Sequence, residues 1–354
     1  MARRSDAWKV IAVVALMLAA AAAAAALALQ QLGASMDERS LAAAGMRVQV
    51  SAGASLRSVL AELARAQAVR RPRLVEWYLR LHGLHLNAQA GIYELQEGAS
   101  ARATLEQLNA GEVVLSQVTI VEGWTFAQMR AALNASADLA HDWLHLDDIA
   151  VMRALGRREL PAEGRFFPDT YRFAAGTSDR RIYELALQRM NERLAQEWSA
   201  RGPALPIASA DAALILASVI EKETGREDER AKVAAVFSNR LRIGMRLQSD
   251  PTIIYGLGTG YDGNLRRRDL EADGPYNSYT RAGLPPTPIA LPGGASIHAA
   301  LHPAAVKVLY FVATGLGDGS HHFSLTYAEH NAALRQFLRR TGAVPDSAVS
   351  GGSR

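Results

Sequence analysis

Residues 217–230 read ASVIEKETGREDER, and the fold and chemistry of the chain's centre both depend on how this stretch is arranged. It leaves an apolar pattern at helical spacing and passes directly into charged residues. On a helix, the i, i+3 and i+4 spacing places Glu223 on the same face as Val219 and Ile220. Glu221 projects about 160° away from that face. Glu223 therefore continues an apolar stripe, whereas Glu221 points elsewhere.

A carboxyl group at the edge of an apolar face is the candidate for acid catalysis. Loss of solvation disfavours the charged form and raises the pKa of a glutamate above about 4.3. A general acid that works near neutral pH needs a pKa of roughly 6–7. Glu223 is in the better environment for that task. The alternative is a charged helix end that enters water, with Glu227 and Arg230 paired on its surface.

Composition excludes several classes of protein. The chain has 354 residues, 49% of them hydrophobic, which predicts two domains or one large one with a sizeable core. It has no cysteine, so disulfides, thiolate metal sites and thiol nucleophiles are excluded. A net charge of +4 without a long basic stripe argues against nucleic acid as a partner.

The N-terminus predicts a membrane anchor. Residues 10–29 are an uninterrupted apolar run, about the length that crosses a bilayer as a helix. Arg3, Arg4 and Lys9 precede it, which predicts a cytoplasmic N-terminus, with the bulk of the chain on the periplasmic side of an inner membrane. A cleaved signal peptide is the alternative, although signal peptides have shorter apolar regions of about 7–15 residues.

Beyond the anchor, the pattern predicts an α+β fold in two parts. Residues 30–45 resemble a linker, and residues 46–112 resemble a small α/β module of two strands and three helices. In this module, Ser55 and Pro72 are expected at helix starts and Gly111 at a helix end.

The second part is predicted to form a larger α+β domain over residues 113–342. Helices are expected at 181–198, 211–225 and 229–245, and the segment from 246 to 305 is rich in loops. Loops this long in a compact domain are functional or disordered, and their Tyr, Asn and Pro content favours function. The tail, residues 343–354, is predicted to be disordered.

Several long motifs resemble one family. IEKET at 220–224 is followed by NRLRIGMRLQSDPTIIYGLG at 239–258, PYNSYTRAGLPPTPIALPG at 275–293 and HHFSLTYAEHN at 321–331. Together with VEGWTF and EGRFFPDTYRF earlier in the chain, they resemble the endolytic murein transglycosylases (the YceG-like, MltG family).

The resemblance implies a fold and an activity. Its members are single-pass inner-membrane proteins with a LysM-like module and a periplasmic catalytic domain. They cut peptidoglycan glycan strands internally, leave 1,6-anhydro-N-acetylmuramic acid ends and help to terminate the strands that the synthases make. The family's catalytic glutamate is the second of the E-K-E-T motif, which is Glu223 here. No metal or cofactor is implied, and the histidines do not have an H-E-x-x-H spacing.

The same motifs supply candidate substrate-binding residues. These are Gln248, Asp250, Tyr276, Asn277, Tyr279 and His321. Each has a structural alternative, such as turn capping for Asp250 and an aromatic corner for the two tyrosines.

Several interpretations stay open on sequence alone. Glu163 precedes a glycine and is expected in a turn, although it could reach the cleft. Trp77 and Tyr78 are expected in the core of the module rather than on a glycan. A hydrolytic muramidase and a glycan-binding scaffold for synthases remain alternative functions.

Overall fold

The computed structural model describes residues 3–51 and 53–342, and these divide into two compact units. Unit 1 holds the chain up to Ser116 together with Arg172–Thr177, and unit 2 holds Gln117–Tyr171 and the chain from Ser178 onward. The fold is a mixture of helices and short two-stranded sheets, as the predicted α+β class requires. The predicted tail, residues 343–354, lies outside the described residues.

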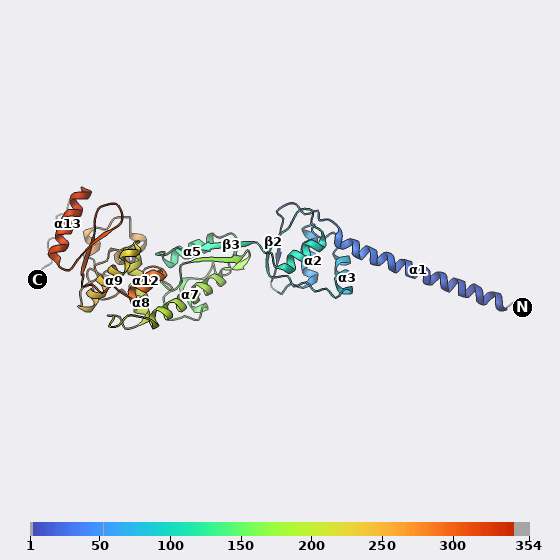
Figure 1. The fold of residues 1–354 in the computed structure, drawn as a ribbon, viewed down its shortest axis with the longest axis horizontal. Coiled ribbons are helices and arrows are strands. Elements are labelled where there is room, and N and C mark those ends of the chain that lie inside the picture. The colour runs from blue at the N-terminus through green and yellow to red at the C-terminus, as the bar shows by residue number, and fades with distance from the viewer. Residues whose placement is uncertain (1–2, 52, 343–354) are drawn as a thin grey trace. The chain divides into compact units, whose positions relative to one another are not determined.

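The N-terminal helix α1 (Arg3–Asp37) is longer than the predicted span of 10–29 (Figure 1). Within the described part of the chain, one helix is long and apolar enough to cross a membrane, at Trp8–Asp37. The expected linker is therefore helical over its first half. This segment also packs against the module, because Met36 is 2% exposed and belongs to the module's core.

The rest of unit 1 follows the predicted order of elements. These are β1 (Arg47–Val50), α2 (Leu56–Arg65), α3 (Pro72–Leu81), β2 (Gly91–Glu94) and α4 (Ala101–Ala110). The two strands pair antiparallel. Ser55 caps α2 by accepting from the Ser58 N–H, Pro72 opens α3, and Gly111 ends α4 in the left-handed conformation. These three predicted helix boundaries are confirmed.

The core of unit 1 corrects one expectation about its aromatic residues. Leu63, Val75 and Tyr93 are completely buried in this core. Tyr78 packs against it and stacks on His82. Trp77, however, is 64% exposed. The prediction that Trp77 is a core residue was wrong, because Trp77 lies about 200° around α3 from the buried Val75 and Leu79.

A mixed segment follows, and most of it belongs to unit 2. Its elements are β3 (Leu115–Thr119), α5 (Phe126–Ala135), β4 (Leu139–Ala140), α6 (Asp148–Ala154), β5 (Thr170–Ala174), β6 (Thr177–Ser178) and α7 (Asp179–Ser199). Strands β3, β5 and β6 each have residues in both units. In the sheets, β3 pairs with β5 and β4 with β6. Thr125 starts α5 with a capping box that includes Gln128.

The second half of unit 2 carries the EKET helix. Its elements are α8 (Ala210–Glu223), α9 (Glu227–Arg242), α10 (Asp250–Leu257), η1 (Gly258–Gly260), α11 (Arg267–Glu271), α12 (Gly294–Leu301), β7 (Tyr310–Ala313), β8 (His321–Ser324) and α13 (Tyr327–Thr341). Strands β7 and β8 form an antiparallel hairpin. Three short α-helices and one 3-10 helix therefore interrupt the segment from 246 to 305 that was predicted to be loop-rich.

Helix α8 is the centre of this half, and α12, α9, α7 and α10 all pack on it. Leu214, Ala217 and Val219 have no exposed surface. A helix that is apolar nearly all round must be enclosed by other elements, since burial of each aliphatic side chain contributes about 1.5–3 kcal/mol.

Three of the quoted motifs converge on this buried helix. The Ile289 N–H donates to the Ser218 hydroxyl of α8 at 3.0 Å, which fixes the proline-rich loop. Gly164 has a φ of +78°, and a side chain there would clash with Pro288, so EGRFF lies against the same loop. The Gly123 N–H of VEGWTF donates to the Leu291 carbonyl at 2.9 Å. Motifs far apart in the sequence thus surround the helix that ends at Glu223.

Candidate active site

Glu223 is the last residue of α8 and is mostly enclosed by protein. Its Oε1 atom accepts a hydrogen bond from the Ser249 hydroxyl at 2.5 Å. Ser249 itself is 1% exposed. The prediction that the two glutamates face different surroundings is confirmed, because Glu223 accepts from Ser249 whereas Glu221 accepts from the Gly293 N–H at 2.9 Å.

The surroundings of Glu223 raise its pKa to about 7, and burial is the main cause. The Ser249 hydrogen bond lowers this pKa, the negative charge of Asp250 raises it, and the charge of Arg240 lowers it. Near neutral pH the carboxyl group therefore exchanges between its protonated and ionised forms. One side chain can then donate a proton and take one back within a single reaction.

Ser249 is held by a small network of hydroxyl groups. Its N–H donates to Ser278 Oγ at 2.9 Å, and Thr252 Oγ1 donates to its carbonyl at 2.7 Å. Ser278 and Thr252 also share a hydrogen bond of 2.8 Å, and both are buried. The hydroxyl that faces Glu223 is thus fixed by backbone and side-chain contacts on both sides.

Asp250 and Tyr279, two of the predicted residues, lie together beside Glu223. The Tyr279 hydroxyl donates to Asp250 Oδ1 at 2.7 Å. Burial raises the pKa of Tyr279, and the charges of Asp250 and Glu223 raise it further. Tyr279 therefore stays protonated and acts as a donor, while Asp250 brings a negative charge to the site.

Arg240 is a buried cation near Glu223 that sequence analysis did not select. Its Nε donates to the Leu309 carbonyl at 2.7 Å and its Nη1 to the Leu247 carbonyl at 2.6 Å. Its guanidinium also lies over the Tyr310 ring, 5.4 Å from the centroid. Burial lowers the pKa of Arg240. Nothing in its sequence context distinguishes it from the neighbouring arginines, because its contacts include Leu309 and Tyr310, about 70 positions later.

Gln248 lies next to this site in a strained conformation. Its φ is +50°, which is rare for a residue with a side chain. The backbone N–H donates to the Ser278 carbonyl at 3.1 Å, and the residue is exposed. The backbone thus holds the amide side chain at the surface beside Ser249.

Asn277 is placed differently from its prediction. It is 5% exposed, and its Nδ2 donates toward three carbonyls, with the shortest contact at 2.7 Å to Ala272. Its Oδ1 accepts from the Tyr279 N–H at 2.8 Å and also from Thr280. An amide with both ends occupied has no capacity left for a sugar. The hydrogen bonds of Asn277 therefore hold the loop that carries Tyr279 in place.

Tyr276 also makes its contacts within the protein. Its ring packs edge-on against Tyr255 with centroids 5.0 Å apart, and its hydroxyl is hydrogen-bonded to Thr287 Oγ1 at 2.8 Å. The tyrosine is half-buried against the core around α8. This is the aromatic corner that was the structural alternative for Tyr276.

His321 is not joined to Glu223 by any interaction found among the described residues. Its Nδ1 contacts Glu229 Oε2 at 2.7 Å, and its backbone N–H also donates to Glu229. Glu229 is buried on α9 and is contacted by Arg226 as well. His321 thus connects the β7–β8 hairpin to α9, which is a structural contact that the sequence did not reveal.

Glu163 is the second buried carboxyl group with a strongly raised pKa. Burial raises its pKa to about 7, although hydrogen bonds from the Phe126 N–H and the Tyr255 hydroxyl lower it. Phe126 is the first residue of α5, and its N–H lies 3.0 Å from Glu163 Oε1. Glu163 therefore caps that helix, which fits the expectation of a turn residue.

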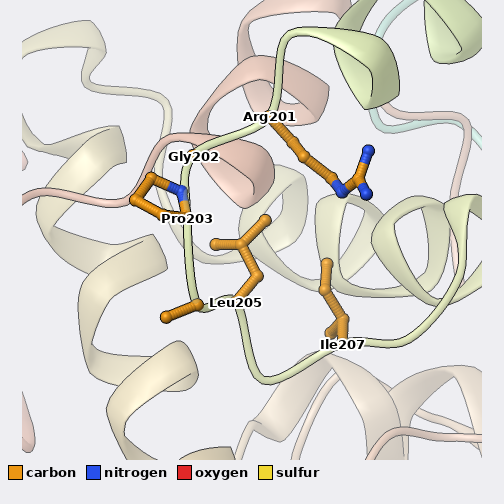
Figure 2. Close-up of a pocket in the computed structure, with 6 residues that line it drawn as sticks. Arg201, Gly202, Pro203, Leu205 and Ile207 are labelled. Carbon is orange, nitrogen blue, oxygen red and sulfur yellow. The ribbon is translucent and has the colours of Figure 1, made fainter.

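A hollow of about 430 Å³ lies on the turn between α7 and α8 (Figure 2). It is lined by Arg201, Gly202, Pro203, Ala204, Leu205 and Ile207. None of these six residues is an acid or a nucleophile. The chemistry of the protein is therefore assigned to the surroundings of Glu223, not to this hollow.

Comparison with known proteins gives consistent matches over most of the chain. The model of the YceG-like family matches residues 48–336. The chain is 30% identical over 311 residues to the endolytic murein transglycosylase of Bacillus subtilis (strain 168), covering 83% of this chain and 85% of the relative. A relative of the same name from Streptococcus pneumoniae (strain D39) is 27% identical over 327 residues, and the match covers 82% of this chain but only 58% of that longer protein.

A solved structure resembles the fold as well. The crystal structure of a YceG-like protein from Listeria monocytogenes matches with a TM-score of 0.50 and 28% identity, over 81% of this chain and 98% of the Listeria chain. The family model covers far more than half of the sequence. The chain therefore belongs to the YceG-like family.

Proposed function

We propose that this protein is an endolytic murein transglycosylase that cleaves the β-1,4 bond between N-acetylmuramic acid and N-acetylglucosamine. The relatives that carry this name support the reaction class. The observation that carries the proposal for this chain is the state of Glu223. It is a mostly enclosed carboxyl group whose pKa is raised to about 7, at the end of the helix around which the family's motifs gather.

Glu223 serves as acid and then as base in the proposed reaction. Its protonated carboxyl group gives a proton to the glycosidic oxygen as the bond from C1 of N-acetylmuramic acid breaks, through an oxocarbenium-like transition state. The C6 hydroxyl of the same sugar then attacks C1, and the ionised Glu223 takes its proton. The product carries a 1,6-anhydro ring, no water is consumed, and Glu223 ends protonated for the next turnover.

We assign supporting roles to the residues around the acid. Asp250 and Tyr279 bind the sugar and set the charge next to Glu223, and Gln248 contacts the strand from the exposed side. Tyr276 and His321 act indirectly, through the loop and the hairpin that they anchor. Asn277 contributes by holding the Tyr279 loop in place.

The N-terminal part of the chain has a proposed role of its own. Helix α1 anchors the protein in the inner membrane, with its N-terminus in the cytoplasm and the chain beyond α1 in the periplasm. Residues 46–112 are the LysM-like module, and the exposed Trp77 gives this module an aromatic surface. The natural substrates are nascent glycan strands, and the partners are the synthases that make them.

The proposal is tested by the mass of the products. Full-length protein in detergent micelles is incubated with uncrosslinked glycan strands, and the new ends are identified by mass spectrometry. Anhydro ends from the interior of long strands are the expected result, since each is lighter by one water than a hydrolysed end.

Two results would replace the proposal. New reducing ends would make the protein a hydrolytic muramidase. Retention of strands by a folded protein that generates no new ends would make it a glycan-binding scaffold.

A further inference from the structure

Two histidines and a buried glutamate meet at the C-terminal ends of α7 and α12. His298 lies on α12 and His302 directly follows it, so their i, i+4 spacing places both imidazoles on one side of the helix. The two rings stack with centroids 4.3 Å apart. Glu197, in the last turn of α7, faces them and is 7% exposed.

We propose that Glu197, His298 and His302 form a binding site for a divalent transition-metal ion of the zinc class. One donor atom of each residue lies within 4.8 Å of the other two. Glu197 Oε2 is 2.8 Å from His298 Nδ1 and 3.8 Å from His302 Nε2. Donor atoms around a tetrahedral zinc ion are about 3.3 Å apart, given Zn–N bonds of about 2.0–2.1 Å. Small side-chain rotations would bring the three donor atoms to this spacing, and the side chain of His298 is more than half exposed.

The carboxylate is already oriented for this task. Arg193 Nη2 pairs with Glu197 Oε1 at 2.9 Å, one helical turn earlier on α7. This contact leaves Oε2 directed at the histidines. A charged group that hydrogen-bonds the far oxygen of a ligating carboxylate is a usual outer-shell partner of a metal site.

The donor set determines the kind of ion. Two neutral imidazoles and one carboxylate suit zinc and its neighbours cobalt and nickel, whereas magnesium and calcium prefer oxygen donors alone. Three protein ligands leave a fourth position for water. Glu197 Oε2 lies closer to His298 Nδ1, at 2.8 Å, than to His302 Nε2, at 3.8 Å.

Ion binding would fasten together the helices that support Glu223. Helix α12 packs on both α7 and α8. The Gly293 N–H, just before α12, donates to Glu221 in the EKET stretch of α8. A metal at the other end of α12 therefore stabilises the enclosure of α8 and has no step in catalysis. The inference is independent of the proposed reaction.

Isothermal titration with zinc chloride tests the site on full-length protein without a histidine tag, in micelles, after removal of metal by a chelator. We expect one ion per chain with micromolar affinity or better. Replacement of zinc by cobalt(II) should give the visible absorption of a tetrahedral site. The midpoint of thermal unfolding should rise with zinc concentration, because the ion binds the folded state.

Variants locate the ion. His298→Gln and His302→Gln should each weaken zinc binding by at least about tenfold, and Arg193→Gln should weaken it by about tenfold through the outer shell. His85→Gln, an exposed histidine of unit 1, is the matched control and should bind zinc like the wild type. No zinc binding by the wild type would overturn the proposal, as would wild-type affinity in the His298→Gln, His302→Gln double variant.

Discussion

Ser249 donates its hydroxyl proton to Glu223 Oε1 over 2.5 Å, across 26 positions of sequence. The hydroxyl favours the ionised form of the glutamate and opposes the effect of burial, which favours the protonated form. The pKa of about 7 is the balance of these two effects with the charges of Asp250 and Arg240. Changes to each partner should therefore move the pH dependence of the enzyme in a direction that can be stated in advance.

Glu223→Gln should reduce the rate of strand cleavage by at least about 100-fold, because an amide cannot supply the acid proton. Anhydro ends counted by mass spectrometry measure this rate. Glu221→Gln is the matched control, since its amide oxygen can still accept from the Gly293 N–H. Cleavage by Glu223→Gln at the wild-type rate would show that the acid lies elsewhere.

Ser249→Ala should move the falling, alkaline limb of the pH–kcat/KM profile to higher pH. Without the hydroxyl, the ionised form of Glu223 loses a hydrogen bond and its pKa rises. The unfolding free energy should fall by about 1 kcal/mol, the usual contribution of one hydrogen bond. Ser199→Ala, an exposed serine of α7, should leave the profile unchanged.

Asp250→Asn should move the same limb in the opposite direction. The negative charge of Asp250 raises the pKa of Glu223, so its removal lowers that pKa. The amide oxygen of asparagine can still accept from Tyr279, which preserves the local geometry. A limb that stays in place, or moves to higher pH, would mean that Asp250 does not act on Glu223 through its charge.

Glu223→Gln should stabilise the fold more at pH 8 than at pH 5. The pKa of Glu223 is raised on folding, so the folded state binds more protons than the unfolded state between about pH 4.5 and 7. Its contribution to stability is therefore full at low pH and is lost as pH rises through 7. The gain in unfolding free energy from Glu223→Gln should be larger at pH 8 than at pH 5 by up to about 3 kcal/mol. Urea unfolding of both proteins at the two pH values measures it, and equal differences at both would contradict the shift.

Asn277→Ala should lower the unfolding free energy by about 2–4 kcal/mol, because several backbone groups lose their partner. Urea unfolding measures this loss. Asn264 is an exposed asparagine of the same region, and Asn264→Ala should change the unfolding free energy little. A raised KM with unchanged stability would instead restore the sugar-binding role that the sequence predicted for Asn277.

Local patterns in the sequence were sufficient for the helices and for the choice of Glu223. Helical projection separated Glu223 from Glu221 because both lie on one regular element, and the structure confirms the separation. Capping residues located helix boundaries for a similar reason. Ser55 and Gly111 act on groups within a few residues of themselves.

The parts that the sequence did not reveal depend on contacts between distant segments. Ser249 precedes an Asp-Pro pair and reads as a turn residue, yet its partner is the end of another helix. His321 is paired with a glutamate 92 positions earlier. No periodicity encodes such pairs, so residue type and motif could suggest His321 for the site but not its actual neighbour.

Helix α1 runs without a break from Arg3 to Asp37, and Met36 is part of the core of unit 1. A flexible linker would let the module move through a wide volume, whereas a continuous helix restricts that movement. From Leu29 to Met36 the helix rises by about 10 Å at 1.5 Å per residue. In the proposed topology the module is therefore held at a set, short height above the lipid. In that topology the module can reach only what lies close to the membrane surface.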